Sequence, residues 1–548
     1  MKIFNRFGLH LNPYVSALSA ALIFLFVFLG VMFTEAMKSY FAAIQDFISY
    51  NLGWFYILCV GFYVIFVVWL YFSPYGRIRL GPDDEKPKFS YMSWFAMLFS
   101  AGMGIGLVFY SVAEPMTHYM KPPVGVPRTI DAAQNAMVLT YFHWGLHAWA
   151  IYIVIGLALA YFTHRKDMPL SLRSIFYPLI GKRVEGTIGN LIDTFAVLGT
   201  LFGLATSLGF GVMQVNAGLH YAGILDLSLQ NQVILIACIT GAATISVVSG
   251  LERGILYLSN INIVLGFLLL LFVFFTGPTL FLLKSWVQSM GDYAAQFVHL
   301  TYWTAAYKSE TPQWHDWQKN WTLFYWSWWI AWSPFVGMFI ARISRGRTIR
   351  EFILGVSLVP SIITFFWLTV FGNTAIYFDL FGGGADQIAD AVTDPQKLPT
   401  ALYMLLDKLP LASITAILAT IVITGYFVTS SDSGSLVVDM ITAGGHHEPP
   451  IKQRIFWAVM EGVVAAVLLI TGGASADGLV ALQTAALTTA LPLSIILILT
   501  CWGLVKALRS DPGRARKFLP PAELDAQEKA NAKKARVNAE RESMDLQS

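Results

Sequence analysis

The sequence is poor in cysteine and in charged residues. Three of its 548 residues are cysteine, and charged residues make up 13% of the chain. Cys59, Cys238 and Cys501 all lie in apolar segments, which indicates small packed side chains rather than a disulfide framework or a metal site. Soluble domains carry about 25% charged residues. The composition therefore excludes an ordinary soluble domain.

Two functional classes lack their signatures. The GxxxxGK[ST] motif that cradles phosphates in ATPases does not occur in the sequence. The sequence also has no convergent set of acid, nucleophile and base, so we expect neither an enzyme nor a bound cofactor. Any transport by this chain would have to use an ion gradient or solute exchange.

Long apolar runs are abundant. Hydrophobic residues make up 56% of the chain, and the mean hydropathy is +0.60. Runs of about 20 apolar residues recur, each long enough to cross a bilayer as a helix. We therefore expect an all-α membrane protein with twelve transmembrane helices, at residues 15–36, 52–73, 91–113, 137–162, 190–218, 231–250, 256–280, 321–341, 352–373, 410–431, 455–472 and 481–505.

The distribution of positive charge supports this topology. With a cytoplasmic N-terminus, the inside segments hold 28 of the 36 lysines and arginines. A missed or invented helix would scramble this bias, because cytoplasmic loops collect basic residues. We therefore expect a multi-pass protein of the bacterial cytoplasmic membrane, with both termini cytoplasmic and membrane lipids as its surroundings.

Helix-breaking residues mark two of the spans. The third contains Gly102, Gly104 and Gly106, which favour unwound backbone, and the eighth contains Ser333-Pro334, which we expect to interrupt the helix. Close helix packing and a simple kink are the alternatives. Because the two spans are five apart, the pattern favours two inverted five-helix repeats, as in many secondary transporters.

The chain accordingly divides into five parts. They are residues 1–89, a cytoplasmic N-terminus with two peripheral helices; 90–280, the first repeat; 281–320, an amphipathic interfacial helix and loop; 321–508, the second repeat; and 509–548, a charged cytoplasmic tail. We expect the outside segment 374–409 to be an irregular loop. The tail is either simply solubilising or a regulatory membrane contact.

Two aromatic sets lie within predicted spans. Tyr325, Trp328, Trp329 and Trp332 share one helix face, and Trp144, Trp149 and Tyr152 occur in the fourth span. Tryptophan faces attract quaternary ammonium groups, which cannot donate hydrogen bonds. The alternative is helix packing with an aromatic belt. His143 and His147 are spaced like a metal pair, but without a neighbouring acid we expect structural histidines.

A hydroxyl cluster ends the tenth span. Thr429 and Ser430 supply hard oxygen atoms, which alkali cations prefer, and Asp432 adds an intramembrane carboxylate. Together with carbonyls of the unwound third helix, these hydroxyls could hold Na⁺. Membrane serines and threonines also bond to carbonyls of their own helix, which is the alternative explanation.

The sequence resembles the betaine/choline/carnitine transporter family over about residues 50 to 505. The motifs are Gly102-Met103-Gly104-Ile105-Gly106 through Glu114-Pro115, the segment 144–152, and WSWWIAWSPFVGMFIARISRGR at 326–347. The resemblance implies a leucine-transporter-like inverted repeat preceded by two extra helices. It also implies homotrimers with contacts through the amphipathic segment after the seventh span.

The resemblance also implies site residues. The substrate cage would be Trp144, Trp149, Tyr152 and Trp329, with Trp328 and Trp332 along the inner pathway and the backbone of Ala101, Gly102 and Met103 near the substrate carboxylate. One sodium ion would bind Ser100, Met103, Tyr426, Thr429 and Ser430. A second would bind Thr200 and Phe335, although Leu204 replaces a threonine of sodium-coupled relatives.

Two further positions bear on substrate and ion. Sodium-independent carnitine exchangers of the family carry an arginine near the seventh span, where this chain has Ile263. Choline-type members tend to have aspartate at the position of Gly106, so glycine favours betaine. The resemblance thus implies sodium-coupled import of glycine betaine by alternating access, with no nucleic-acid partner. A proton-coupled choline importer, a carnitine-type exchanger and, in a different class, an ion channel are the alternatives.

Overall fold

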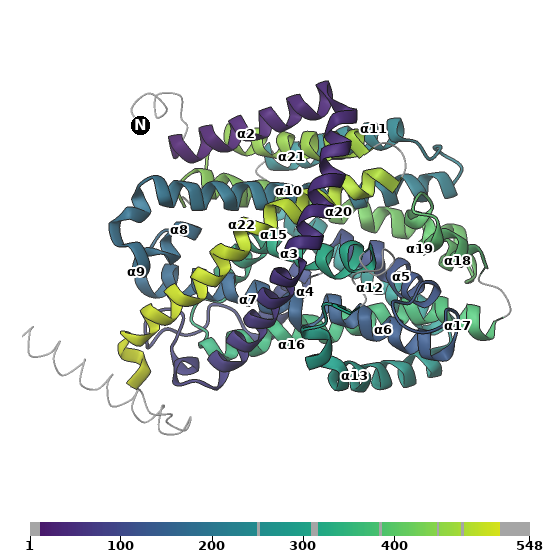
Figure 1. Ribbon diagram of the computed structural model, residues 1–548, viewed down its shortest axis with the longest axis horizontal. Helices are drawn as coiled ribbons and strands as arrows, with labels where there is room; N and C mark the ends of the chain where they lie inside the picture. The colour runs from purple at the N-terminus through teal and green to yellow at the C-terminus, as the bar shows by residue number, and fades with distance from the viewer. Residues whose placement is uncertain are drawn as a thin grey trace, which may run out of the picture.

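The described chain is helical throughout. The computed structural model describes residues 11–102, 104–248, 252–307, 316–382, 386–445, 449–472 and 476–515. Within these residues the elements are helices, with one isolated bridge between Arg79 and Thr348 and no named strand. Figure 1 shows α3 crossing α22 on its way from α2 to the edge where α16 lies.

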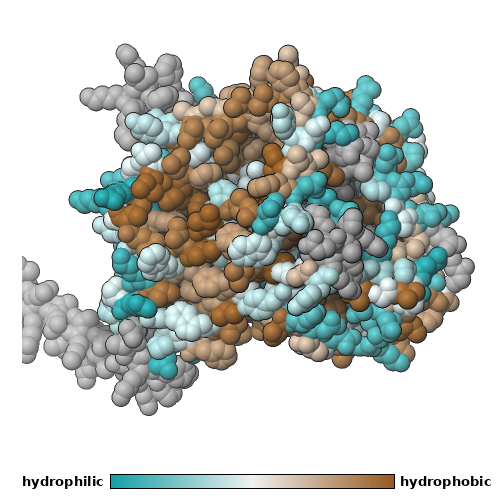
Figure 2. Space-filling view, viewed as in Figure 1, coloured by the Kyte–Doolittle hydropathy of each residue, from teal (hydrophilic) through white to brown (hydrophobic). Residues whose placement is uncertain are grey.

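Ten helical segments in the described residues are long and apolar enough to cross a membrane. Exposed aromatic and aliphatic side chains on α2 and α3, such as Phe28, Trp54 and Ile65, suit contact with lipid. Figure 2 shows the corresponding hydrophobic surface. The ten segments are Pro13–Met32 (α2), Thr34–Phe72 (α3), Ile130–Arg165 (α6, α7 and η2), Thr187–Tyr221 (α10), Leu229–Ser246 (in α11), Leu258–Thr276 (in α12), Ile349–Phe381 (α16, η5 and α17), Ala412–Thr442 (α20), Ile451–Gly472 (α21) and Val480–Arg509 (in α22).

The other two expected spans are the ones that carry the site. Residues 91–113 form two pieces, α4 (Tyr91–Gly102) and α5 (Ile105–Met120), and residues 321–341 lie in η4 (Lys319–Leu323) and α15 (Phe324–Ile343). The first is broken, and the second is rich in tryptophan and serine, which lower its hydropathy. The count of twelve and the inverted repeat therefore stay predictions.

The loop expected between the first and second spans is almost absent. α3 begins at Thr34 and runs for 39 residues, so the expected outside segment 37–51 is helical. No glycine or proline occurs between Thr34 and Leu52, and nothing in this stretch therefore interrupts a helix.

The prediction of an irregular loop at 374–409 is wrong. This segment folds into α17 (Thr374–Phe381), α18 (Asp386–Thr393), η6 (Leu398–Thr400) and α19 (Ala401–Asp407). Buried side chains at helical spacing, including Ile388, Val392, Leu402 and Leu406, hold these short helices against the rest of the chain. α18 and α19 both contact α5, which begins at the site.

Two spans differ from expectation: the eighth has no break where one is predicted, and the fourth has a break where none is predicted. α15 runs without interruption through Pro334, so the predicted interruption at Ser333-Pro334 is wrong. The Ser333 hydroxyl donates to the carbonyl of Ile330 at 2.8 Å, and this is the carbonyl that loses its partner because proline has no N–H. The fourth span, by contrast, breaks at Gly145 between α6 (Ile130–Trp144) and α7 (Leu146–Ala160).

Glycine at this break has a steric explanation. A Cβ atom at this position would lie 2.6 Å from the carbonyl oxygen of Tyr141 and 2.6 Å from the ring of Phe365. Only glycine fits such a close approach. Trp144 ends one helix, while Trp149 and Tyr152 lie on the next, so the three residues do not share one continuous helix as the fourth span predicts.

The segment after the seventh span is helical. α13 spans Thr279–Thr301, with Leu282, Tyr293 and Leu300 buried and Val287 and Val298 exposed. Its position at the membrane interface and its role in a trimer stay predictions. The tail prediction, for residues 509–548, falls mostly outside the described residues, which end at Ala515.

Small residues bring the site helices together. Gly337 of α15 faces α7 so closely that a Cβ would lie 2.1 Å from Cγ2 of Ile155. Gly203 of α10 likewise lies against the backbone of Trp332. Small residues at such crossings let backbones approach in membrane proteins. α15 is thereby fixed between α7 and α10.

An ion-pair network connects η2 (Tyr161–Arg165) with two segments that are distant in the sequence. Arg165, in η2 after α7, contacts Asp83 at 2.8 Å and Asp511 at 2.6 Å, and Tyr161 donates to Asp511 at 2.7 Å. Burial alone would raise the pKa of Asp511, but the hydrogen bonds from Arg165 and Tyr161 outweigh it and hold this pKa below its usual range. Three distant segments are thus tied together.

We expect Asp511→Asn to destabilise the fold by about 2–3 kcal/mol, because removing one partner of a buried ion pair leaves the other charge incompletely compensated. Asp83 still contacts Arg165, which limits the loss. Thermal unfolding in detergent should show a lowered melting temperature. The control is Asp394→Asn, whose exposed partner Lys397 lies 3.9 Å away; equal melting temperatures for the two variants would contradict the prediction.

Candidate functional site

The first cavity lies among α5, α7 and α15 and is bounded mainly by aromatic rings. Its volume is about 440 Å³. All six predicted cage and pathway aromatics line it, together with Gly106. The full lining is Gly104, Gly106, Leu107, Trp144, Ala148, Trp149, Tyr152, Trp328, Trp329, Trp332 and Thr364.

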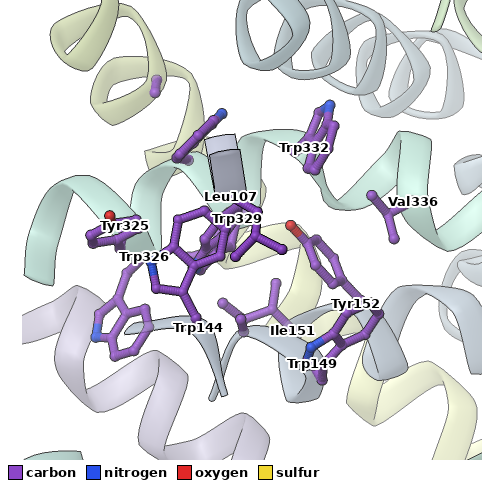
Figure 3. Close-up of a cluster of buried hydrophobic side chains, with 14 of the residues drawn as sticks. Leu107, Trp144, Trp149, Ile151, Tyr152, Tyr325, Trp326, Trp329, Trp332 and Val336 are labelled. Atoms are coloured by element: carbon purple, nitrogen blue, oxygen red, sulfur yellow. The ribbon is translucent and has the colours of Figure 1, made fainter. Parts of the chain in front are cut away.

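The rings form several walls at different angles (Figure 3). Trp328 and Trp329 are stacked, with centroids 4.8 Å apart and planes 13° from parallel. Trp144 meets Trp329 edge to face at 5.0 Å, and Tyr152 does so at 6.2 Å. Tyr152 also contacts Trp149 at 5.5 Å. A compact cation between these walls would face aromatic surfaces on more than one side.

Hydrogen bonds fix the orientation of the tryptophans. Trp329 donates its indole N–H to the carbonyl of His143 at 2.9 Å, and Trp144 donates to Oε2 of Glu114 at 2.7 Å. His143 is near the end of α6, where carbonyls have no partner within the helix. The break at Gly145 therefore supplies the acceptor for Trp329.

Two polar atoms on the cavity wall are unsatisfied. The hydroxyl of Tyr152 and the indole nitrogen of Trp332 are buried and have no hydrogen-bond partner in the described part of the chain. Figure 3 shows the hydroxyl end of Tyr152 directed toward Leu107 and Trp329. Buried donors normally find partners, so these atoms suit a polar group of a ligand.

The glycine motif interrupts the third span at the edge of the cavity. α4 ends at Gly102 and α5 begins at Ile105, with Gly104 extended between them. Gly106 packs under Trp328, and a Cβ there would lie 2.3 Å from Cη2 of that ring. Ser100 and Ala101 are the residues of α4 that precede Gly102, and the predicted Met103 lies outside the described residues.

A second cavity of about 630 Å³ contains part of the predicted ion sites. Tyr426, Thr429, Ser430 and Phe335 all line it. It shares Trp332 with the first cavity. The Thr429 hydroxyl donates to the carbonyls of Gly425 at 3.0 Å and Tyr426 at 3.3 Å within its own helix, as the alternative explanation expects.

The second predicted sodium set is brought together only in part. Phe335 lines the second cavity, but Thr200 of α10 does not. The Thr200 hydroxyl is nevertheless buried and has no partner among the described residues. Leu204, one turn further along α10, packs against Gly434 and offers no oxygen.

The two histidines of the fourth span do not act as a pair. His147 contacts the Thr301 hydroxyl at 2.8 Å, whereas His143 contacts Glu114 at 2.6 Å and the Thr322 hydroxyl at 3.0 Å. Side-chain ligand atoms of His143, His118 and Glu114 lie within 4.8 Å of one another, close enough to surround a metal ion. In this arrangement His118 and His143 each direct a ring nitrogen at the Glu114 carboxylate.

Glu114 is the residue that the sequence analysis did not assign. It is fully buried beside the cage and bonds to Trp144 and Tyr325 as well as to the histidines. The signal was available, because an ionisable residue inside a membrane segment is a functional candidate by default. Glu114 was not assigned because it lies one residue beyond the expected end of the third span, at residue 113.

Comparisons with known proteins give a matching family and several relatives. A family model described as betaine/carnitine/choline family transporter matches residues 14–513. A glycine betaine transporter of Acinetobacter baylyi is 44% identical over 510 residues, covering 93% of this chain and 75% of that protein.

Two further relatives show similar coverage. A high-affinity choline transport protein of Escherichia coli is 42% identical over 530 residues, covering 96% of this chain and 76% of that protein. An uncharacterised transporter of Mycobacterium tuberculosis is 49% identical over 514 residues, covering 93% of this chain and 84% of that protein.

Replacing Trp329 by leucine should weaken substrate binding by roughly 1–2 kcal/mol, about tenfold, because a desolvated cation–π contact is lost. Tryptophan fluorescence titration of the purified protein measures this. Trp502→Leu, on the exposed face of α22, serves as the control for lost fluorescence. Unchanged affinity in the Trp329 variant would show that the aromatic face of α15 serves helix packing alone.

Replacing Gly106 by alanine should also weaken binding about tenfold, because the added methyl group overlaps Trp328 and overpacking of this kind costs about 1–3 kcal/mol. Trp328 is stacked on Trp329 and Phe324, so it cannot move without disturbing the cage. The control is Gly241→Ala in α11, where a Cβ meets nothing within 4 Å. Equal affinities in the two variants would show that the Trp328 ring can move aside without weakening binding.

Proposed function

The chain belongs to the betaine/carnitine/choline family of transporters, and we propose that it imports glycine betaine together with Na⁺ by alternating access. Ten apolar helices in its described residues accord with a multi-pass membrane transporter. The homotrimer, the bacterial cytoplasmic membrane and the cytoplasmic position of both termini are part of the same proposal.

The aromatic cavity carries the proposal. A trimethylammonium group is positively charged but has no hydrogen to donate, so aromatic faces are its best partners. Trp144, Trp149, Tyr152 and Trp329 offer such faces around one space. The lining is mostly aromatic and apolar with a few polar groups, which is the usual character of a small-molecule site.

Two observations favour betaine over choline. Betaine is a zwitterion, and the unsatisfied donors of Tyr152 and Trp332 suit its carboxylate. Choline has a net positive charge and gains from a carboxylate in contact with it. The position where choline carriers tend to place aspartate is Gly106, and the ring of Trp328 occupies the adjacent space.

The second cavity supports sodium as the coupling ion. It gathers Tyr426, Thr429 and Ser430, whose oxygen atoms are ligands of the hard type. Ile263 also lines it, at the position where sodium-independent exchangers carry an arginine. No fixed positive charge at that position competes with a bound cation.

A proton-coupled choline importer is the second candidate, because one relative with 42% identity is a choline transport protein. Uptake into proteoliposomes, with and without a sodium gradient, separates the two candidates. The assay should be run with betaine, choline, carnitine, proline and ectoine. Uptake that ignores sodium but follows a pH gradient would replace the sodium proposal, and a preference for choline would replace the substrate.

Removing both hydroxyls, by Thr429→Ala with Ser430→Ala, should raise the sodium concentration for half-maximal uptake by about tenfold, because the remaining carbonyl oxygens leave the cation under-coordinated. The measurement is initial uptake against sodium concentration. Thr424→Ala, whose hydroxyl bonds to Thr420 of the same helix, is the matched control. A shift of equal size in the control would remove the special role of this pair.

A further inference from the structure

Glu114 forms a buried hydrogen-bonded centre behind the substrate cage. Its side chain and those of His118 and His143 are completely buried. Oε1 contacts His143 Nδ1 at 2.6 Å and His118 Nε2 at 3.3 Å. Oε2 accepts from the indole of Trp144 at 2.7 Å and from the hydroxyl of Tyr325 at 2.5 Å.

The partners of Glu114 define its charge. Trp144 can only donate, and the Tyr325 hydroxyl donates to the same oxygen. His143 can donate from Nδ1 while its Nε2 accepts from Thr322, which is the pattern of a neutral imidazole. His118 can donate from Nε2 in one of its tautomers, and with this tautomer four donors on one carboxylate would favour the ionised form against the cost of burial. The centre then carries one negative charge.

That charge has no permanent positive partner in the described part of the chain. The ion pairs of Glu114 there are with His118 and His143 alone, and neither an arginine nor a lysine joins them. Aromatic rings surround the histidines, with Trp321 4.6 Å from His118 and Tyr325 4.7 Å from His143. Such apolar surroundings let the field of a charge extend further than it would in water.

We propose that Glu114 acts as a fixed negative charge behind the cage and raises the affinity for the positively charged end of the substrate. The inference rests on the proposed function, since it requires a cationic group in the cage. Glu114 is a positioning residue rather than a contact residue: it reaches the ligand through Trp144, which lines the cavity and holds the carboxylate on its N–H.

Two physical effects act in the same direction. The carboxylate attracts the cation directly across one indole ring, a separation on the order of 8–10 Å when a cation–π contact is added. It also accepts the indole N–H of Trp144, which shifts electron density toward the ring and strengthens the ring's attraction for a cation. At an effective dielectric near 20, an attraction at this distance changes affinity by about tenfold or more.

The variant Glu114→Gln removes the charge and keeps the shape. The amide oxygen can take the place of Oε2 and accept from Trp144 and Tyr325, while the amide NH₂ faces the histidines. Both histidines can accept this group by moving their own proton to the other ring nitrogen. His143 would then donate to the Thr322 hydroxyl, which can also accept.

The probes are glycine betaine and 3,3-dimethylbutanoate, in which carbon replaces nitrogen and the shape is retained without the positive charge. Affinities for wild type and variants come from fluorescence titration, or from competition where the second ligand is weak. We expect Glu114→Gln to lower the ratio of betaine affinity to dimethylbutanoate affinity by about tenfold. A purely structural role would lower both affinities together and leave the ratio unchanged.

Two further variants sharpen the test. Glu114→Asp keeps the charge, so it should retain the wild-type ratio even if both affinities fall, and it decides the question should Glu114→Gln not fold. Glu461→Gln removes another fully buried carboxylate, on α21, which lines neither cavity. It should leave the ratio unchanged.

The outcomes are distinguishable. A lowered ratio in Glu114→Gln, with wild-type ratios in the other two variants, supports the inference. An unchanged ratio in Glu114→Gln, or the same fall in Glu114→Asp, overturns it and leaves the proposed function standing. Wild-type protein that binds betaine no better than dimethylbutanoate, and takes up no quaternary ammonium compound, overturns both.

Discussion

A buried indole needs an acceptor for its N–H, and the arrangement of the site follows from meeting this need in an apolar interior. Trp329 finds its acceptor at the open end of α6, and Trp144 finds one in the carboxylate of Glu114. The first acceptor exists because the helix breaks at Gly145, and the second because a carboxylate is tolerated beside the rings. The cage is therefore held by polar contacts behind it, and its faces stay free for a ligand.

The close approach of α15 to its neighbours is the second requirement. Gly337 lets α15 lie against α7, and Gly203 lets it lie against α10. Without these small residues the tryptophans of α15 would stand too far from Trp149 and Tyr152 to share one space with them. Helix packing and ligand geometry therefore depend on the same positions, so substitutions there affect folding and binding together.

The sequence predicts the apolar helices and the cage aromatics well, because both depend on local composition and spacing. Prediction from the sequence fails mainly where a contact between residues far apart in the chain determines the local structure. Glycine is required at position 145 because Phe365, which is distant in the sequence, and a carbonyl leave no room for a side chain. The continuation of α15 through Pro334 has a local cause instead, because the neighbouring Ser333 donates to the carbonyl that proline leaves without a partner. The short helices between 374 and 409 form because α5 and its neighbours bury them. The sequence offers Glu114 as an ionisable residue next to a membrane span, but its hydrogen-bond partners appear only when residues from three helices meet.

Trp332 belongs to the walls of both cavities, one aromatic and one rich in hydroxyl groups. A solute in the first and an ion in the second would thus lie against the same side chain. Thermodynamic reciprocity then requires that whatever factor the ion contributes to solute affinity, the solute contributes to ion affinity. The indole ring of Trp332 is then the direct contact through which each binding event would change the affinity of the other.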